Sequence, residues 1–427
     1  MDRADSYVNV VTELGTEFDK STQTRIRSLP ELTFEEIEAI YEQSGLGARI
    51  VDRVVDDATR APFEITNADE PFDWKSVKSE LDDLDALNEL GDTWRWARLY
   101  GGAIAVLVVN DGLEFDKPLE LERATRLKGI NVIEGRYITP SGFNAKLGST
   151  AFRLPSHYDL SIPLPGSVSV KRVHRSRCIR FDGAKVPPSR MLSRSTGWAP
   201  SVLRKIQQSL RQVVSSRGYG ENILHEISVL ILKLKGFHEA LLGDENDEET
   251  LRKMFRAMRQ GISIQNTLVL DADSDIGEQS RTVSGLVDLI SLFVDALVSD
   301  SDMPRTILLG EQPGGLNATA DAETRGWYDH VALQRQRILT PALTRVIDII
   351  LRLREQRGDR VPEEWTIEWG SLWQPSDKEL AETRLINVQA DTAQIDTMVT
   401  TAEEVRGRYI GSGDIVPDVV GELEVGT

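Results

Sequence analysis

The sequence predicts an α+β protein that is mostly helical. Apolar residues recur at helical spacing over several long stretches, from 201 to 224, from 286 to 298 and from 319 to 357. Residues 113–190 instead alternate short β-prone runs with glycine and proline, which is typical of an antiparallel sheet. The chain has 427 residues, of which 40% are hydrophobic and 28% charged, so it can bury a substantial core.

The N-terminal region is expected to begin as an arm and continue as a helix. Residues 1–30 are polar and lack periodicity, so no regular structure is expected there. A helix is predicted from 32 to 61, because Thr33 and Glu36 have the spacing of a capping box and Pro62 would end it.

A second helical part and a strand should precede the antiparallel sheet. Residues 74–90 form a charged helical stretch, followed by the segment 94–100. The apolar run 103–109 ends at an Asn-Asp-Gly turn signal and is predicted to be a buried strand.

The second half of the chain is predicted to be dominated by helices. The expected elements are a helix at 201–224, strands at 227–234 and 267–270 around a short helix at 248–260, a helix at 286–298, a glycine-rich loop at 310–316, a long helix at 319–357 with a kink at Pro341, a strand at 365–369 and a helix at 376–402.

The helix at 286–298 has apolar residues on one side, which we expect to pack. That side comprises Leu286, Leu289, Ile290, Phe293 and Leu297, whereas Asp288, Ser291 and Asp295 lie off it. Its length and its two aspartates argue against a membrane span, and the acidic start of the chain argues against a signal peptide.

The composition argues against several functional classes. A net charge of −18 does not suit a protein that grips DNA phosphates, although DNA could still slide past it. Cys178 is the single cysteine, and the five histidines lack metal-ligand spacing. The phosphate-binding and hydrolase motifs GxxxxGK[ST], GxGxxG, HExxH and GxSxG are absent. We therefore expect no catalytic residues, no metal and no cofactor.

Several stretches resemble the portal proteins, or head-to-tail connectors, of tailed viruses. They are GWAPSVLRKIQQSLRQVV (197–214), SDMPRTILLGEQPGGLNATADAETRGWYDHVALQRQRILTPAL (301–343), IEWGSLWQPSDKELAETR (367–384), TAEEVR (401–406) and SGLGARIVDRVVDDATRAPFEI (44–65). The Gly-Leu-Asn-Ala-Thr run followed by Trp-Tyr-Asp is the most specific of them, and the order of the elements matches as well.

The resemblance implies a portal fold that assembles into a ring of about twelve subunits. Its parts would be an N-terminal arm (1–30), a wing (31–200 and the long kinked helix and strand at 321–375), stem helices (201–224 and 283–309), a clip (225–282), a tunnel loop (310–320) and a short crown (376–427). Arg204 and Arg211, on the first stem helix, are expected to form ion pairs between subunits.

The tunnel loop is the predicted DNA-contacting site. It comprises Gln312, Pro313, Gly314, Gly315, Leu316 and Asn317. Glycine permits rearrangement, and the two amides can hydrogen-bond phosphates weakly and reversibly. Glu311 should point away from the channel, toward Arg305 or Arg325 of a neighbour. The alternative is that Gly314-Gly315 is a simple turn between helices.

The resemblance implies a conduit for double-stranded DNA during packaging, retention and ejection. The implied partners are further copies of the chain, DNA passing without sequence preference, the terminase large subunit, a head–tail adaptor and the major capsid protein, with no membrane. The protein would lie at the portal vertex of the virion and in the host cytoplasm during assembly. Two alternatives remain: another virion structural or assembly protein, and a metal-dependent nucleic-acid enzyme.

Overall fold

The computed structural model describes most of the chain. The described residues are 30–67, 72–194, 196–225, 228–233, 253, 275–280, 286–310, 317–373, 377–397, 399–402 and 404–406. The chain divides into two compact units, one formed by Met1–Thr59 with Asn67–Trp365 and the other by Arg60–Thr66 with Thr366–Thr427. No helix among the described residues is long and apolar enough to span a membrane.

The predicted N-terminal helix is two helices, α1 (Phe34–Gln43) and α2 (Gly45–Thr59). The capping box at the start of α1 is confirmed, because the Thr33 N–H donates to the Glu36 carboxylate at 2.8 Å and the Glu36 N–H donates to the Thr33 hydroxyl at 3.2 Å. The single helix predicted for 32–61 is wrong at Ser44, whose extended backbone interrupts it. The Ser44 hydroxyl accepts the Gly47 N–H at 3.3 Å, so a serine cap begins α2.

A similar break divides the next helical region into α3 (Trp74–Asp83) and α4 (Ala86–Tyr100). The predicted helix 74–90 is therefore wrong at Asp85, which adopts a left-handed backbone with φ 48°. Aspartate tolerates this conformation better than most residues do. Gly101, at φ 90°, then ends α4 and turns the chain into β2 (Gly102–Val109), the predicted buried strand.

Two antiparallel sheets confirm the predicted β region. One has the order β3 (Leu127–Glu134), β2, β7 (Cys178–Asp182), and the other has the order β4 (Ile138–Phe143), β5 (Pro155–Leu164), β6 (Ser167–His174). Buried side chains from both sheets surround Trp198, whose indole N–H donates to the Ile138 carbonyl at 3.2 Å. The short helix α5 (Pro188–Leu192) lies between β7 and that tryptophan in the sequence.

A buried ion pair fixes the connection between β2 and β3. The Asp111 and Arg177 side chains are each only 1% exposed, and their closest nitrogen and oxygen are 2.5 Å apart. Asp111 also accepts the backbone N–H groups of Leu113 and Glu120, and Arg177 donates to the Lys117 carbonyl at 2.8 Å. These bonds hold the segment 111–120, which leads into the short helix η2 (Leu121–Arg123).

The second half follows the predicted order where it is described. The elements are α6 (Leu203–His225), β8 (Ser228–Lys233), β9 (Asp275–Ser280), α9 (Leu286–Ser301), α10 (Arg305–Leu309), α11 (Asn317–Gln334), the π-helical turn η5 (Arg335–Leu339) and α12 (Thr340–Gln356). β8 confirms the strand predicted at 227–234, and it pairs with β9, which the sequence did not indicate. The strand at 267–270 and nearly all of the helix at 248–260 lie outside the described residues.

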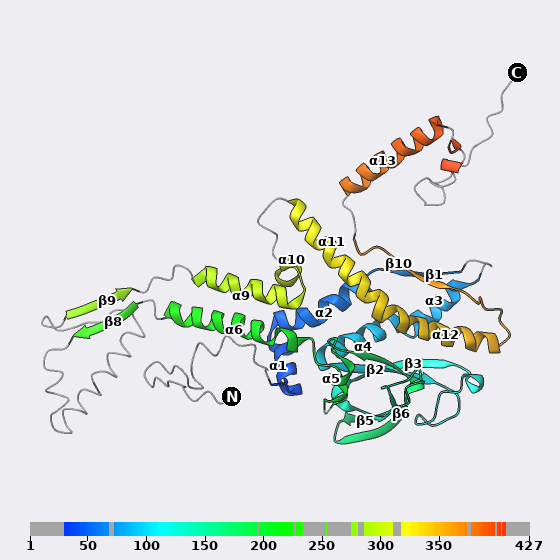
Figure 1. The fold of residues 1–427 in the computed structure, drawn as a ribbon, viewed down its shortest axis with the longest axis horizontal. Coiled ribbons are helices and arrows are strands. Elements are labelled where there is room, and N and C mark those ends of the chain that lie inside the picture. The colour runs from blue at the N-terminus through cyan, green and yellow to red at the C-terminus, as the bar shows by residue number, and fades with distance from the viewer. Residues whose placement is uncertain are drawn as a thin grey trace, which may run out of the picture. The chain divides into compact units, whose positions relative to one another are not determined.

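The irregular part of the long helix lies just before Pro341. The Thr340 N–H donates to the Arg335 carbonyl, five residues back, which is the pattern of a π-helix. Pro341 occupies the first turn of α12 and has no N–H to donate. The long helix predicted for 319–357 is confirmed as three consecutive segments from Asn317 to Gln356 (Figure 1).

The described residues of the second unit include a short strand pair and the helix α13 (Asp377–Asp396). β1 (Phe63–Thr66) pairs antiparallel with β10 (Thr366–Trp369), which confirms the strand predicted at 365–369. α13 is shorter than the helix predicted for 376–402. Every side chain from 381 to 390 is exposed.

We predict that Asp111→Asn destabilises the fold by about 3–5 kcal/mol, because it leaves the Arg177 charge buried without a partner. Burial raises the pKa of Asp111, but the hydrogen bonds from Arg177 and two backbone N–H groups lower it overall. The difference in free energy of unfolding between this variant and the unchanged protein, measured with urea, should therefore be largest at neutral pH. It should shrink as the pH falls below about 4.

Asp159→Asn is the matched control. Its partner Arg172 is 59% exposed, so this variant should lose less than about 1 kcal/mol. Equal losses for the two variants would contradict the role of the buried pair.

Candidate functional site

Helices α6 and α9 lie side by side and form the core of the candidate site (Figure 1). On α6, Leu203, Ile206, Leu210 and Val213 are all buried and follow a spacing of three and four residues. On α9, Val294 and Leu297 are buried. Apolar residues at this spacing form one side of a helix, so each helix contributes one side to the contact.

Small polar residues sit within the buried side of α6. Ser209 and Ser216 are buried, and their hydroxyls donate to the backbone carbonyls of Ile206 and Val213 at 3.1 and 2.8 Å. Because both hydroxyls bond to their own helix, they need no partner on α9.

The outward side of α9 is apolar as well. Leu289 is 47% exposed and Leu292 is 62% exposed, and Ala296 is exposed on the same side. These three residues, here called the outer stripe, again follow a spacing of three and four. Of the residues predicted to form the packing side, Leu297 is buried within the chain, whereas Leu289 is exposed, so packing of Leu289 against a neighbouring subunit stays a prediction. The Leu286 side chain lies outside the described residues.

Charges differ between the open sides of the two helices. Asp288 and Asp295 are exposed beside the outer stripe of α9, whereas Lys205, Gln208 and Arg211 are exposed on α6. An acidic and apolar surface on one helix thus complements a basic and polar surface on the other.

Most of the nearby arginines and lysines are already paired within the chain. Arg204 contacts Glu31 of its own chain at 3.0 Å, and the expectation that it also pairs with a neighbouring subunit stays a prediction. Lys205 contacts Asp302 at 2.6 Å. Arg211 forms no ion pair with a described residue, so the expectation that it pairs between subunits stays a prediction.

Side-chain bonds hold the short helix α10, which precedes the predicted tunnel loop. The Arg49 guanidinium donates to the Leu308 carbonyl at 2.6 Å, and Arg305 contacts Asp295 at 2.9 Å. Gly310, at φ 73°, ends α10 with its N–H donating to the Thr306 carbonyl. Glycine adopts this backbone without strain.

The predicted loop residues themselves lie largely outside the described residues. These are Glu311, Gln312, Pro313, Gly314, Gly315 and Leu316. Asn317 is the first residue of α11, so the helix begins inside the range 310–320 that the sequence assigned to the loop. The tryptophan of the most specific sequence match, Trp327, is buried and donates to Asp57 at 2.8 Å, so it supports the fold.

The described residues offer little reactive chemistry. No group of three or more His, Cys, Asp or Glu side chains among them is placed to hold a metal ion. Burial raises the pKa of the Cys178 thiol to about 12, so it is a poor nucleophile. Burial lowers the pKa of His174, whose ring contacts that of His157 with centroids 5.1 Å apart. The notable feature of the described residues is therefore the exposed apolar surface of α9, which can pack against another protein surface.

The comparison with protein families gives one assignment. Residues 35–393 match the family model described as phage portal protein.

Three curated relatives align over most of the chain. Two are named anti-CBASS protein Acb1: the one from Caulobacter sp. (strain RHG1) is 26% identical over 91% of this chain, and the one from Sphingomonas paeninsulae is 25% identical over 92%. The chain spans only 62% of the length of each. An uncharacterized protein of Haemophilus influenzae is 26% identical over 86% of this chain and 81% of its own length.

Solved structures that align with this chain are distant in sequence. The neck of an empty gene transfer agent particle aligns with a TM-score of 0.48 and 12% identity, covering 82% of this chain and 88% of that one. An HK97 family phage portal protein from Corynebacterium diphtheriae aligns with a TM-score of 0.38 and 8% identity, covering 67% and 84%.

We predict opposite behaviour for two leucines of α9. Leu297→Ala should lower the free energy of unfolding by about 2–5 kcal/mol, because Leu297 is fully buried and its removal leaves a cavity. Leu292→Ala should change it by less than about 0.5 kcal/mol in a lone subunit, because Leu292 is largely exposed. Urea unfolding at a protein concentration too low for oligomers measures both, and a large loss for Leu292→Ala alone would contradict the assignment of the two sides.

Proposed function

The chain belongs to the phage portal protein family, and we propose that it assembles into a ring at one vertex of a capsid, through which double-stranded DNA enters and leaves. The observation that carries the proposal is the outer stripe of α9. It is an apolar surface on a helix whose opposite side is already packed against α6.

A head-to-tail contact between copies would cover this surface. The outer stripe and the aspartates beside it on one copy would face Lys205, Gln208 and Arg211 on α6 of the next. Such a contact joins two different surfaces, so repetition closes a ring when a whole number of equal rotations makes one full turn. For this family, about twelve copies per ring are expected.

The charge of the chain suits a conduit better than a clamp. Every subunit adds a net charge of −18. Acidic or neutral surfaces facing a channel keep DNA phosphates solvated and avoid strong binding at any position. DNA could then move through in either direction, with weak contacts from the tunnel loop Gln312–Asn317.

The parts of the chain are assigned as follows. Residues 31–200 and 321–375 form the wing and face the major capsid protein, and α6 and α9 form the stem. Residues 225–282 form the clip, which binds the terminase large subunit during packaging and the head–tail adaptor afterwards. Residues 376–427 form a short crown. The ring assembles in the host cytoplasm and remains in the virion.

The activity that the name of these relatives describes is not carried over to this chain. The name anti-CBASS protein Acb1 belongs to proteins of which this chain spans 62%. No described feature of the chain favours that activity for it, so the portal function is the one we propose.

Charge on the outer stripe should abolish assembly. We predict that Leu289→Glu with Leu292→Glu leaves the subunit folded, since both side chains are exposed, but prevents ring formation, because burying carboxylates in an apolar contact is strongly unfavourable. Mass photometry should then show monomers in place of rings.

Leu147→Glu is the control for this experiment. Leu147 is 81% exposed and lies between β4 and β5. This variant should assemble like the unchanged protein. Rings formed equally well by the double variant would contradict the proposed interface.

Stiffening the tunnel loop should separate assembly from DNA handling. We predict that Gly314→Pro with Gly315→Pro still forms rings but packages or retains less DNA, because proline fixes the backbone where glycine permits rearrangement. Particle DNA content, measured by nuclease-protected DNA per capsid, provides the test. Normal DNA content would favour the simple-turn interpretation of these glycines.

A further inference from the structure

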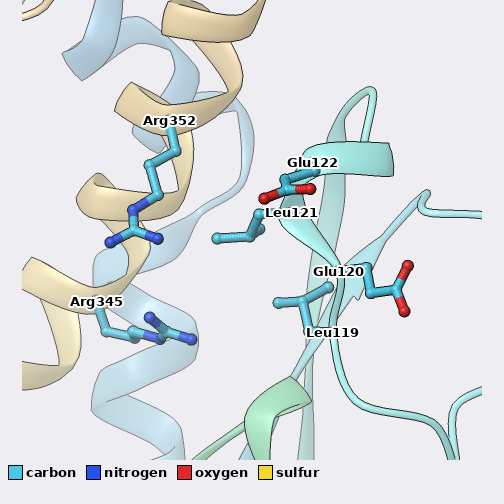
Figure 2. Close-up of a pocket in the computed structure, with 6 residues that line it drawn as sticks. All are labelled: Leu119, Glu120, Leu121, Glu122, Arg345 and Arg352. Carbon is cyan, nitrogen blue, oxygen red and sulfur yellow. The ribbon is translucent and has the colours of Figure 1, made fainter.

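A groove lies between α12 and the segment that follows the β2 strand, away from the paired helices α6 and α9. Figure 2 shows Arg345 and Arg352 on α12 facing Leu119, Leu121 and Glu122 across it. The groove encloses about 430 Å³. A neighbouring hollow continues it past Arg352 to Glu355 and Gln356.

The wall opposite α12 is held in place by named bonds. The Leu119 N–H donates to the Ser176 hydroxyl at 2.7 Å, and the Glu120 N–H donates to the buried Asp111 carboxylate at 3.3 Å. The Gln356 side-chain amide donates to the Leu121 carbonyl at 2.8 Å, which connects the wall to α12. The groove is therefore a preformed feature of the fold.

The two groove arginines differ from the arginines that follow them in the chain. Arg354 is bound to Glu80 and Ser76, and Arg357 donates to the Thr125 carbonyl. Arg345 and Arg352 form no hydrogen bond or ion pair with any described residue. They are seven residues apart and so lie on the same side of the helix, separated by about 10 Å along its axis.

The wall opposite them is apolar in its centre. Leu119 and Leu121 point toward the arginines, whereas the Glu120 carboxylate points away (Figure 2). Glu122, near Arg352, adds one acidic group to that wall. A DNA backbone would meet two leucines in place of further cations, so the groove is poorly suited to it.

An extended peptide with alternating acidic and apolar residues matches both walls. Successive side chains of a strand point to opposite sides, so its carboxylates would face the arginines while its apolar side chains face the leucines. A carboxylate accepts two parallel hydrogen bonds from a guanidinium, which makes this pairing specific as well as favourable.

The chain itself contains such a sequence. Residues 409–427 include Asp414, Asp418, Glu422 and Glu424 and no Lys, Arg or His. Within them, Glu422-Leu423-Glu424-Val425 alternates acidic and apolar residues over four positions.

We propose that this groove binds the segment 421–425 of a neighbouring copy of the chain in extended form. Glu422 and Glu424 face Arg345 and Arg352, and Leu423 packs on Leu121. The contact ties adjacent subunits together at a site separate from the outer stripe. The inference rests on the proposed function, because it requires a neighbouring copy.

Cross-linking between two different variants tests the contact directly. Copies carrying Leu121→Cys are assembled together with copies carrying Leu423→Cys, so a disulfide between these positions forms only between subunits. We expect cross-linked dimers whose 121–423 linkage is identified by mass spectrometry, which also detects any linkage through Cys178. In the control, Leu147→Cys, at an exposed position, replaces Leu121→Cys. The yield of cross-linked dimer should then be lower by about tenfold or more.

Charge reversal tests the chemistry of the same contact. Arg345→Glu with Arg352→Glu should lower the cross-linking yield by about tenfold or more, because each hydrogen bond to a charged group contributes enough for roughly one order of magnitude in affinity. Adding Glu422→Arg and Glu424→Arg to the partner copy should restore the yield.

Three results would overturn the proposal. In the first, rings form but the 121–423 cross-link does not. In the second, charge reversal leaves the cross-linking yield unchanged. In the third, the Arg345→Glu, Arg352→Glu protein loses duplex DNA binding but keeps the cross-link. The first result leaves the portal function standing, because the rings are present. Absence of rings would contradict both.

Discussion

Helix α9 has apolar side chains on two sides, and one chain covers only one of them. Its inner side, with Val294 and Leu297, is buried against α6, whereas Leu289 and Leu292 face outward. Fully burying a leucine contributes about 1.5–3 kcal/mol, so leaving two of them uncovered on each subunit favours association. The acidic residues beside them and the basic residues on α6 give that association a direction, which is what a closed ring needs.

The periodic elements could be predicted from the sequence, because their signals are local. The capping box at Thr33, the strand at β2 and the long helical stretch that ends at Gln356 all follow from spacing within a few residues. The helix breaks at Ser44 and Asp85 could not be predicted, because serine and aspartate occur inside helices as well as at their ends. The strand β9 could not be predicted, because its sequence, DIGEQS, has little β propensity.

The sites depended on contacts that no local pattern contains. Leu289 and Leu297 are equally apolar, so their opposite exposure is decided by where α6 packs. The Asp111–Arg177 pair joins residues 66 positions apart, and it places one wall of the groove that Arg345 and Arg352 line from α12. The tunnel-loop residues, by contrast, were proposed from glycine content and family resemblance alone, and their role stays a prediction.

The ring is the central claim, and a negative-stain image of the purified chain tests it most directly. At micromolar concentration and at several salt concentrations, the account predicts closed rings with a central hole. The salt series matters because a net charge of −18 per subunit opposes assembly when it is unscreened. Monomers alone at every salt concentration would contradict the account.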